Sequence, residues 1–203
     1  MSKCNDIALK ITVIGEYFVG KTSIVGRFVD GTFDETYSAT IGFNFLTKAI
    51  EYNGSSYILN IWDTSGSERH RAVAPNYYRG TDGCLLVYDV SNPKSLEPLA
   101  YWYDEFTSFV TTGLNAATVP TLLIGNKSDI GFAQSTAREA ENFAEMHNIP
   151  HHFIVSARNG NNIDAVFKTM VELCSGHQIM NFLSITQSHS DMLNEKGRKK
   201  ECC

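Results

Sequence analysis

The sequence lacks the features of several large classes of protein. None of its apolar runs approaches the roughly 18–20 residues that a helix needs to cross a bilayer. Its first residues offer no small-residue cleavage site, so we expect neither a transmembrane span nor a signal peptide. Basic residues are in deficit, with 17 Lys and Arg against 22 Asp and Glu and a net charge of −5. That balance argues against nucleic-acid binding by bulk charge.

Cysteine is scarce, and its spacing does not fit a metal site or a disulfide framework. The 203 residues contain an odd number of cysteines and no C-x-x-C pair; the five are Cys4, Cys84, Cys174, Cys202 and Cys203. We therefore expect neither a disulfide scaffold nor a zinc ribbon, and a reducing compartment is the natural setting. Hydrophobic residues make up 43%, as in ordinary globular proteins, which argues against wholesale disorder.

Short apolar runs alternate with helical patterns along the chain. Near-continuous runs, typical of strands buried on both faces of a parallel sheet, lie at residues 8–14, 83–89, 119–125 and 152–155. Helical spacing follows residue 20 and recurs at residues 93–110, 135–147 and 162–174. Residues 43–52 and 56–62 flank Asn53-Gly54 and predict a hairpin with a type I′ turn. This order predicts one α/β domain over residues 5–176, followed by a polar, mobile tail at 177–203.

The first apolar run leads directly into residues 15–22, GEYFVGKT, which match the phosphate-loop pattern G-x-x-x-x-G-K-[ST]. Its glycines allow a tight loop whose backbone N–H groups face a polyphosphate, and the next helix adds positive potential at its N-terminus. We expect Lys21 to neutralise the β- and γ-phosphates and the Thr22 hydroxyl to bind Mg²⁺. The alternative, a plain strand–helix connection, is disfavoured because the whole pattern stands in the strand-before, helix-after context.

A second strand ends at residues 62–66, WDTSG. Asp63, at the carboxyl end of a strand, can hold the water shell of a metal ion. The Gly66 N–H can meet a γ-phosphate, where only a residue without a side chain allows close approach. The pattern D-x-x-G is common by itself, and it becomes specific about forty residues after a phosphate loop.

Residues 122–129, LLIGNKSD, indicate which base is bound. Asp129 offers a carboxylate that accepts two adjacent N–H donors, which guanine presents on its N1/N2 edge and adenine does not. Asn126 adds an amide, and residues 156–158, SAR, can add a backbone N–H toward guanine O6. A polar turn is the alternative for N-K-x-D alone, but beside the two phosphate motifs guanine is favoured.

Together these motifs resemble, in order and spacing, the Ras superfamily of small GTPases and, within it, the Rab family. Residues 40–45 (TIGFNF), 61–63 (IWD) and 77–80 (YYRG) resemble Rab signatures, and Cys202-Cys203 resembles the double-cysteine geranylgeranylation signal. The resemblance covers nearly the whole chain. It implies a P-loop NTPase sandwich with a six-stranded, mostly parallel sheet, one antiparallel strand and about five helices.

The resemblance also implies the site residues. The nucleotide would be bound by Gly15, Tyr17, Val19, Gly20, Lys21, Thr22, Ser23, Phe33, Tyr37, Thr40, Gly66, Asn126, Lys127, Asp129, Ser156, Ala157 and Arg158. Mg²⁺ would be held by Thr22, Thr40 and Asp63. Effector proteins would contact an aromatic triad, for which core packing is the alternative: Phe45, Trp62 and Tyr77. Cys202 and Cys203 would carry lipid.

The sequence departs from the family at several positions. Ser67 stands where the family has the Gln that orients the attacking water, so we predict slow intrinsic hydrolysis, with Ser67 and Thr40 as the catalytic candidates. Tyr17 and Phe18 replace small residues; Tyr17 would crowd the γ-phosphate unless both rings turn outward. Arg158 replaces the usual Lys, a change expected to be nearly silent.

The resemblance implies a GTP/GDP-controlled, Mg²⁺-dependent switch that recruits effectors in vesicular membrane trafficking. The alternative is a GTP-binding scaffold with little or no hydrolysis, and Asp129 disfavours an ATPase or kinase. Expected partners are an exchange factor, a GTPase-activating protein, a GDP-dissociation inhibitor and effectors bound through the switch regions, with no nucleic acid. We expect a monomer that cycles between the cytosol and the cytoplasmic face of an intracellular vesicle or organelle membrane.

Overall fold

A computed structural model describes residues 6–35, 40, 42–66, 77–110, 119–132 and 134–176. The predicted site residues Tyr37, Ser67, Cys202 and Cys203 lie outside these ranges, as does the predicted tail at 177–203. No helix in the described ranges is both long enough and apolar enough to cross a membrane.

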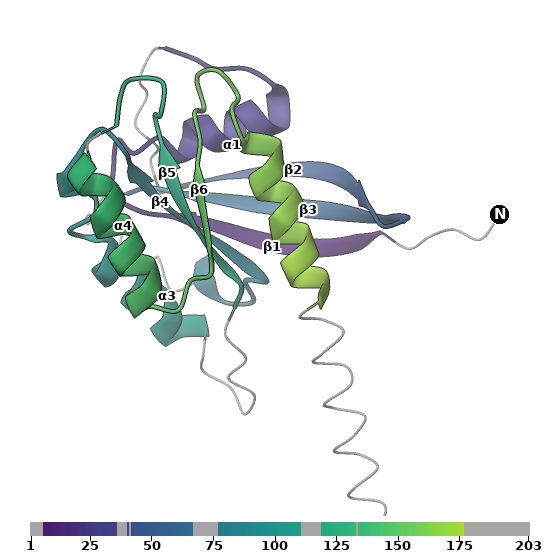
Figure 1. The fold of residues 1–203 in the computed structure, drawn as a ribbon. Coiled ribbons are helices and arrows are strands. Elements are labelled where there is room, and N and C mark those ends of the chain that lie inside the picture. The colour runs from purple at the N-terminus through teal and green to yellow at the C-terminus, as the bar shows by residue number, and fades with distance from the viewer. Residues whose placement is uncertain are drawn as a thin grey trace, which may run out of the picture.

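Six strands form one sheet in the order β2-β3-β1-β4-β5-β6 (Figure 1). They are β1 (Ile7–Ile14), β2 (Phe43–Tyr52), β3 (Ser55–Thr64), β4 (Gly83–Asp89), β5 (Thr121–Asn126) and β6 (His151–Ile154). Among the described strands only β2, paired with β3, runs antiparallel, and every other neighbouring pair is parallel. The predicted six-stranded, mostly parallel sheet with one antiparallel strand is confirmed.

The β2–β3 hairpin turns at the dipeptide that the sequence indicated. Asn53 and Gly54 both have positive φ, at 48° and 76°, and Tyr52 pairs with Ser55 across the turn. Asn and Gly adopt this left-handed conformation at the lowest cost, which is why a two-residue turn of this type selects them.

The helices cover both faces of the sheet. They are α1 (Lys21–Asp30), α3 (Leu99–Val110), α4 (Gln134–Met146) and a last helix at residues 163–176. The described part of the chain thus holds four α-helices, where about five helices were predicted, and residues 77–78 are also helical. The helix predicted at 93–110 is interrupted: Pro93–Ser95 form a 3₁₀ turn, and α3 begins directly after Pro98. Pro98 has no backbone N–H, so a continuous helix would lose a hydrogen bond there.

Two hydrophobic clusters lie on opposite faces of the sheet. One packs α1 and the 163–176 helix on the sheet, and the other packs α3 and α4 on it (Figure 1). Successive residues of β4 alternate between them: Leu85 and Val87 belong to the first cluster, and Leu86 and Tyr88 to the second. Burial on both faces accounts for the near-continuous apolar runs of the central strands.

Candidate nucleotide-binding site

The carboxyl ends of the parallel strands carry the predicted motifs to one edge of the sheet. The phosphate loop follows β1, residues 63–66 end β3 and follow it, and residues 126–129 and 156–158 follow β5 and β6. In open α/β sheets this edge is where ligands bind. The hydrogen bonds described next join these loops into one site.

The phosphate loop passes so close to its neighbours that two of its positions admit only glycine. Gly15 has φ 139°, and a Cβ there would lie 2.2 Å from the Val87 carbonyl oxygen. Gly20 has φ 91°, and a Cβ there would lie 2.4 Å from the Asn126 side-chain nitrogen. Helix α1 starts directly after Gly20, so its first backbone N–H groups lie at the loop.

Lys21 is buried beneath the loop that it would neutralise. Its Nζ donates to the carbonyl oxygens of Gly15 at 3.0 Å and Glu16 at 2.9 Å. Burial lowers the pKa of Lys21 to about 8, against the attraction of Asp63 and Glu16. A bound polyphosphate would place negative charge beside this ammonium and raise its pKa again, which favours the charged form.

Three oxygen-bearing side chains converge beside Lys21. The Thr22 hydroxyl lies 2.6 Å from Asp63 Oδ2 and 2.7 Å from the Thr40 hydroxyl. Asp63 Oδ1 is buried and has no hydrogen-bond partner among the described residues, and burial raises the pKa of Asp63 to about 6. An unpartnered carboxylate oxygen beside two hydroxyls fits a hard cation, and a single carboxylate suits Mg²⁺ that takes its other ligands from phosphate and water.

Gly66, at the end of the second motif, lies against the phosphate loop. A Cβ at Gly66 would lie 2.3 Å from the Tyr17 backbone nitrogen and 2.4 Å from the Glu16 carbonyl carbon. The chain just before it is tied down, because the Ser65 N–H donates to the Gly42 carbonyl oxygen at 2.9 Å. The residues after β3 therefore approach the phosphate loop at backbone distance.

The base-recognition motifs are joined by side-chain hydrogen bonds. Asn126 Nδ2 donates to the Val19 carbonyl oxygen at 2.9 Å, and Asn126 Oδ1 accepts the Ala157 N–H at 3.1 Å. The Ser156 hydroxyl donates to Asp129 Oδ1 at 2.6 Å, and the Asp129 side chain is 15% exposed. The phosphate loop, N-K-x-D and S-A-R thus form one connected cradle whose acceptor carboxylate is held in place.

Comparison with known proteins agrees with this geometry. A sequence profile described as the Ras family matches residues 10–175. The Ypt/Rab-type GTPase ypt7 of Schizosaccharomyces pombe is 34% identical over 197 residues, covering 96% of this chain and 95% of that protein. The Ras-related protein Rab7 of Drosophila melanogaster is 32% identical over 198 residues, covering 96% and 95%. The Ras-related protein Rab-18 of Lymnaea stagnalis is 40% identical over 165 residues, covering 81% and 79%.

This chain belongs to the Rab family of Ras-type small GTPases. Family membership makes it a GTP-binding GTPase of membrane trafficking and a GTP hydrolase. Rab GTPases in general bind GTP or GDP with Mg²⁺, and they act with exchange factors, activating proteins, GDP-dissociation inhibitors and effectors.

The two bulky phosphate-loop residues of this Rab-family GTPase turn outward. The Tyr17 side chain is 54% exposed and that of Phe18 is 50% exposed, and their ring centroids lie 4.5 Å apart. Phe18 has φ 64°, a conformation that small residues adopt more easily. Of the two orientations considered for these rings, the outward one is observed.

The predicted aromatic triad comes together at the β2–β3 surface of this GTPase. The Trp62 ring lies 5.3 Å from that of Phe45 and 5.9 Å from that of Tyr77. Phe43 joins them, 5.0 Å from Trp62 and 4.5 Å from Tyr77, and it is 39% exposed. Since the Phe45 side chain is 49% exposed, the cluster is a surface and not core packing.

Sequence reasoning missed three residues of these sites. Asp89 Oδ2 lies 2.7 Å from Lys127 Nζ and holds that side chain at the base end of the site. Arg27 of α1 donates to the backbone of the S-A-R loop, and Phe43 is part of the aromatic surface. Asp89, a charged residue at the end of a buried strand, carried a usable signal. Arg27 carried no such signal, because a single arginine in a helix is usually a solvent-exposed cation.

Proposed function

We propose that this Rab-family GTPase is a slow GTP/GDP-controlled switch that recruits effectors to an intracellular vesicle or organelle membrane. The observation that carries the proposal is the buried, unpartnered Asp63 oxygen beside the Thr22 and Thr40 hydroxyls, next to the buried Lys21 ammonium. This arrangement suits a nucleotide triphosphate with its metal ion. The connected Asn126–Ala157 and Ser156–Asp129 pairs support guanine as the base.

In this proposal the nucleotide is held by the residues that the sequence indicated. Lys21 neutralises the β- and γ-phosphates, and Thr22, Thr40 and Asp63 hold Mg²⁺, which when bound neutralises charge on those phosphates. Phe33 packs against the base, and Asp129 accepts its N1/N2 donors.

Switching follows from which contacts reach the γ-phosphate end. Thr40 and Gly66 contact only that end, so hydrolysis withdraws the contacts that order both switch loops. Moving a two-state equilibrium from 1:99 to 99:1 needs about 5.5 kcal/mol of differential binding. A few charge-assisted hydrogen bonds of about 1.5–3 kcal/mol each can supply that difference.

We propose that the intrinsic rate of GTP hydrolysis is low. It depends on Ser67, whose short side chain cannot reach the attacking water as the family's Gln does. The resemblance to the Rab family implies activating proteins that supply a glutamine of their own, so the loss of Gln at position 67 need not leave the protein permanently in its GTP-bound state. A chain that releases no phosphate even with cell extract would instead be a GTP-binding scaffold.

We also propose a surface that binds effector proteins and a tail that anchors the protein to a membrane. The cluster of Phe45, Trp62 and Tyr77 is the effector-binding surface, and the GTPase domain covers residues 5–176. The tail at 177–203 ends in a basic run before Cys202 and Cys203, which we propose to be prenylated. A basic residue near an anionic leaflet adds about 1 kcal/mol. Stable anchoring takes two signals, and two prenyl chains, or one chain plus this basic run, would supply them.

The decisive experiment is extraction of the nucleotide from the purified full-length protein, followed by chromatography. We expect GDP or GTP and no adenine nucleotide. Asp129→Ala is the matched variant: it removes the carboxylate that accepts the guanine N1/N2 donors and should purify without guanine nucleotide. An adenine nucleotide in the wild-type protein would overturn the proposal.

A further inference from the structure

We infer that Arg27 is a positioning residue that sets how long the guanine nucleotide stays bound, because it ties the base-recognition loop to the chain that leaves α1. This inference rests on the proposed guanine-nucleotide function. Arg27 touches no reacting atom in that scheme, and it acts through the residues that hold the base. We call Arg27 and its three carbonyl partners the arginine clasp: Gly31, Ala157 and Arg158.

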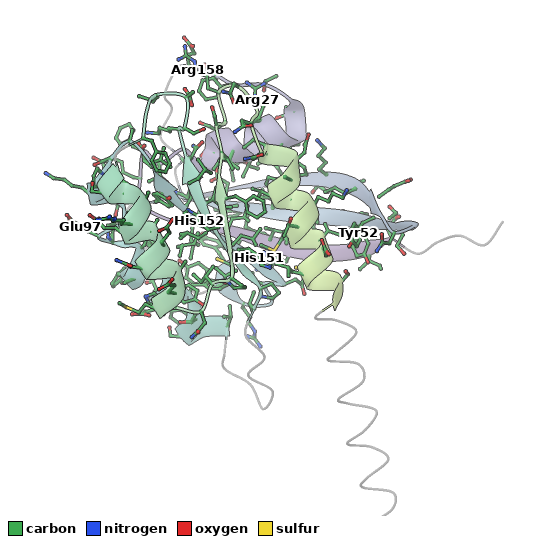
Figure 2. The ribbon with its side chains drawn as sticks, viewed as in Figure 1. Arg27, Tyr52, Glu97, His151, His152 and Arg158 are labelled. Atoms are coloured by element: carbon green, nitrogen blue, oxygen red, sulfur yellow. The ribbon has the colours of Figure 1, made fainter. Side chains whose placement is uncertain are left out.

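The guanidinium of Arg27 is shared among two distant parts of the chain. Its Nε donates to the Ala157 carbonyl oxygen at 2.8 Å and its Nη2 to the Arg158 carbonyl oxygen at 2.6 Å. Its Nη1 donates to the Gly31 carbonyl oxygen at 2.6 Å. Figure 2 shows Arg27 and Arg158 at the same end of the molecule, where the loop after β6 lies beside α1. A planar guanidinium can satisfy three acceptors in this way, whereas an ammonium on a flexible stem cannot fix them in one plane.

On the loop side, the clasp holds a peptide that is already bound to the base site. The Ala157 N–H donates to Asn126 Oδ1 while its carbonyl oxygen accepts from Arg27, so the residue is fixed from both directions. Ala157 is 2% exposed. A residue anchored at both of its polar groups holds the S-A-R loop in one conformation, and recognition of guanine O6 by a backbone N–H of that loop requires such a fixed conformation.

On the helix side, the clasp fixes the exit from α1. Gly31 ends the helix in the left-handed conformation at φ 70°, and its N–H donates to the Arg27 carbonyl oxygen at 3.1 Å. Arg27 therefore binds Gly31 through its backbone and through its side chain. The same guanidinium lies 5.9 Å from the centroid of the Phe33 ring, a cation–π contact. The chain is thus held at the point where it turns toward Phe33.

A second link runs parallel to the clasp and gives a matched comparison. Arg158 Nη2 lies 2.9 Å from Glu35 Oε1, joining the same two segments through side chains. The Arg158 side chain is 59% exposed and that of Glu35 is 72% exposed, so water screens the pair and its contribution is small. The Arg27 contacts end on backbone carbonyls, one of them in a buried residue, so we assign them the larger effect.

The consequence is a coupling between the base and the first switch, which is the loop that follows α1 and includes Thr40. Phe33 and the S-A-R loop, which hold the base in the proposed function, depend on one guanidinium. A partner that pulls residues 31–35 away from α1 has to break the Arg27 contacts, and the base loop then loses its anchor. Opening of the first switch and release of the base are therefore linked events.

The test is the dissociation rate of fluorescent GDP from the full-length protein in Mg²⁺ and excess unlabelled GDP. We expect Arg27→Met to release GDP about tenfold faster, corresponding to about 1.4 kcal/mol. Arg27→Lys should give an intermediate rate, and Glu35→Gln a rate within about twofold of wild type. If Arg27→Met fails to fold, Arg27→Lys carries the test alone.

A selectivity measurement separates positioning from a general loss of stability. Inosine diphosphate keeps O6 and lacks the 2-amino group, whereas 2-aminopurine riboside diphosphate keeps that amino group and lacks both O6 and the N1–H. Asp129, which accepts the N1–H, is the same in wild type and Arg27→Met, so a difference between the two proteins in this second preference reports on O6. In Arg27→Met the preference for GDP over the 2-aminopurine nucleotide should shrink, while the preference over inosine diphosphate, set by Asp129, stays unchanged. Two results for Arg27→Met would overturn the inference about Arg27. One is faster release of all three nucleotides with both preferences unchanged, and the other is an unchanged rate of GDP release. A wild-type protein that retains no guanine nucleotide would overturn the proposed function itself.

Discussion

Asp63 lowers the stability of the folded, nucleotide-free protein, although its carboxylate suits the proposed metal site. Its carboxylate is fully buried, it has one oxygen without a partner among the described residues, and burial raises its pKa to about 6. The folded, nucleotide-free protein therefore binds more protons than the unfolded chain between about pH 4 and pH 6. The free energy of unfolding of that form falls as the pH rises through this window. Above the window the full loss of stability caused by the ionised Asp63 is present.

Asp63→Asn removes the buried ionisable group and with it this loss of stability. We expect the substitution to raise the free energy of unfolding of the nucleotide-free protein at neutral pH by up to about 3 kcal/mol, and to change it little below about pH 4. With GDP and Mg²⁺ present the order should reverse, because the metal loses its carboxylate ligand. Urea unfolding at several pH values measures both effects, with the exposed Asp104→Asn as control. A neutral-pH stability that does not exceed that of wild type would contradict the prediction.

Ser67 and Tyr17 are the two departures that bear on hydrolysis, and we expect them to behave differently. Ser67→Gln should raise the single-turnover rate of GTP hydrolysis by at least about tenfold, because it restores a side chain that can orient water. Tyr17→Gly should stay within about twofold of wild type, because the Tyr17 ring points into solvent. A wild-type rate equal to that of ordinary Rab proteins, unchanged in Ser67→Ala, would contradict the first expectation.

At the scale of elements, the end of β3 meets the phosphate loop at Gly66. A Cβ there would collide with backbone atoms of Glu16 and Tyr17, which cannot rotate away as a side chain can. We expect Gly66→Ala to push the second switch off the loop and to weaken GTP binding by at least about tenfold.

Gly26 provides the matched control for this substitution. It lies within α1, and a Cβ there meets no atom within 4 Å. Gly26→Ala should leave nucleotide binding unchanged and stabilise the protein by about 0.5–1 kcal/mol, since alanine favours the helix. Titration of both variants with fluorescent GTP and GDP tests the pair. Equal GTP affinities in the two variants would show that the close contact of Gly66 with the phosphate loop does not contribute to GTP binding.

The elements differ in how far the sequence predicts them. The β2–β3 hairpin is predictable because a period of two and Asn53-Gly54 act locally. The helix predicted over 93–110 is wrong in its first turns, because helical spacing of apolar residues continues past Pro98 while the backbone cannot. The motif positions follow from sequence, whereas the Arg27 and Asp89 contacts do not. Those contacts join residues far apart in the chain, and only the packed sheet and helices bring them together.

At the scale of the whole molecule, the terminal cysteines decide where the protein resides, in our proposal. Cys202→Ser with Cys203→Ser should move the protein from the membrane fraction to the soluble fraction of a cell lysate, because two lipid chains give stable anchoring and the basic run alone does not. The matched control is Cys4→Ser, at the other end of the sequence. Mass spectrometry of the native protein should show the added prenyl mass on both cysteines. A double variant that stays with the membranes would contradict lipid anchoring.

The strand order also bears on how this GTPase is made. Its proposed nucleotide site draws on residues from Gly15 to Arg158, and β6, which carries the last of these loops, pairs only with β5 among the described strands. During synthesis the N-terminal segments emerge first, so the phosphate loop is exposed long before Ala157 can anchor Asn126. GTP and GDP therefore cannot stabilise a nascent chain shorter than about 158 residues as they stabilise the finished one.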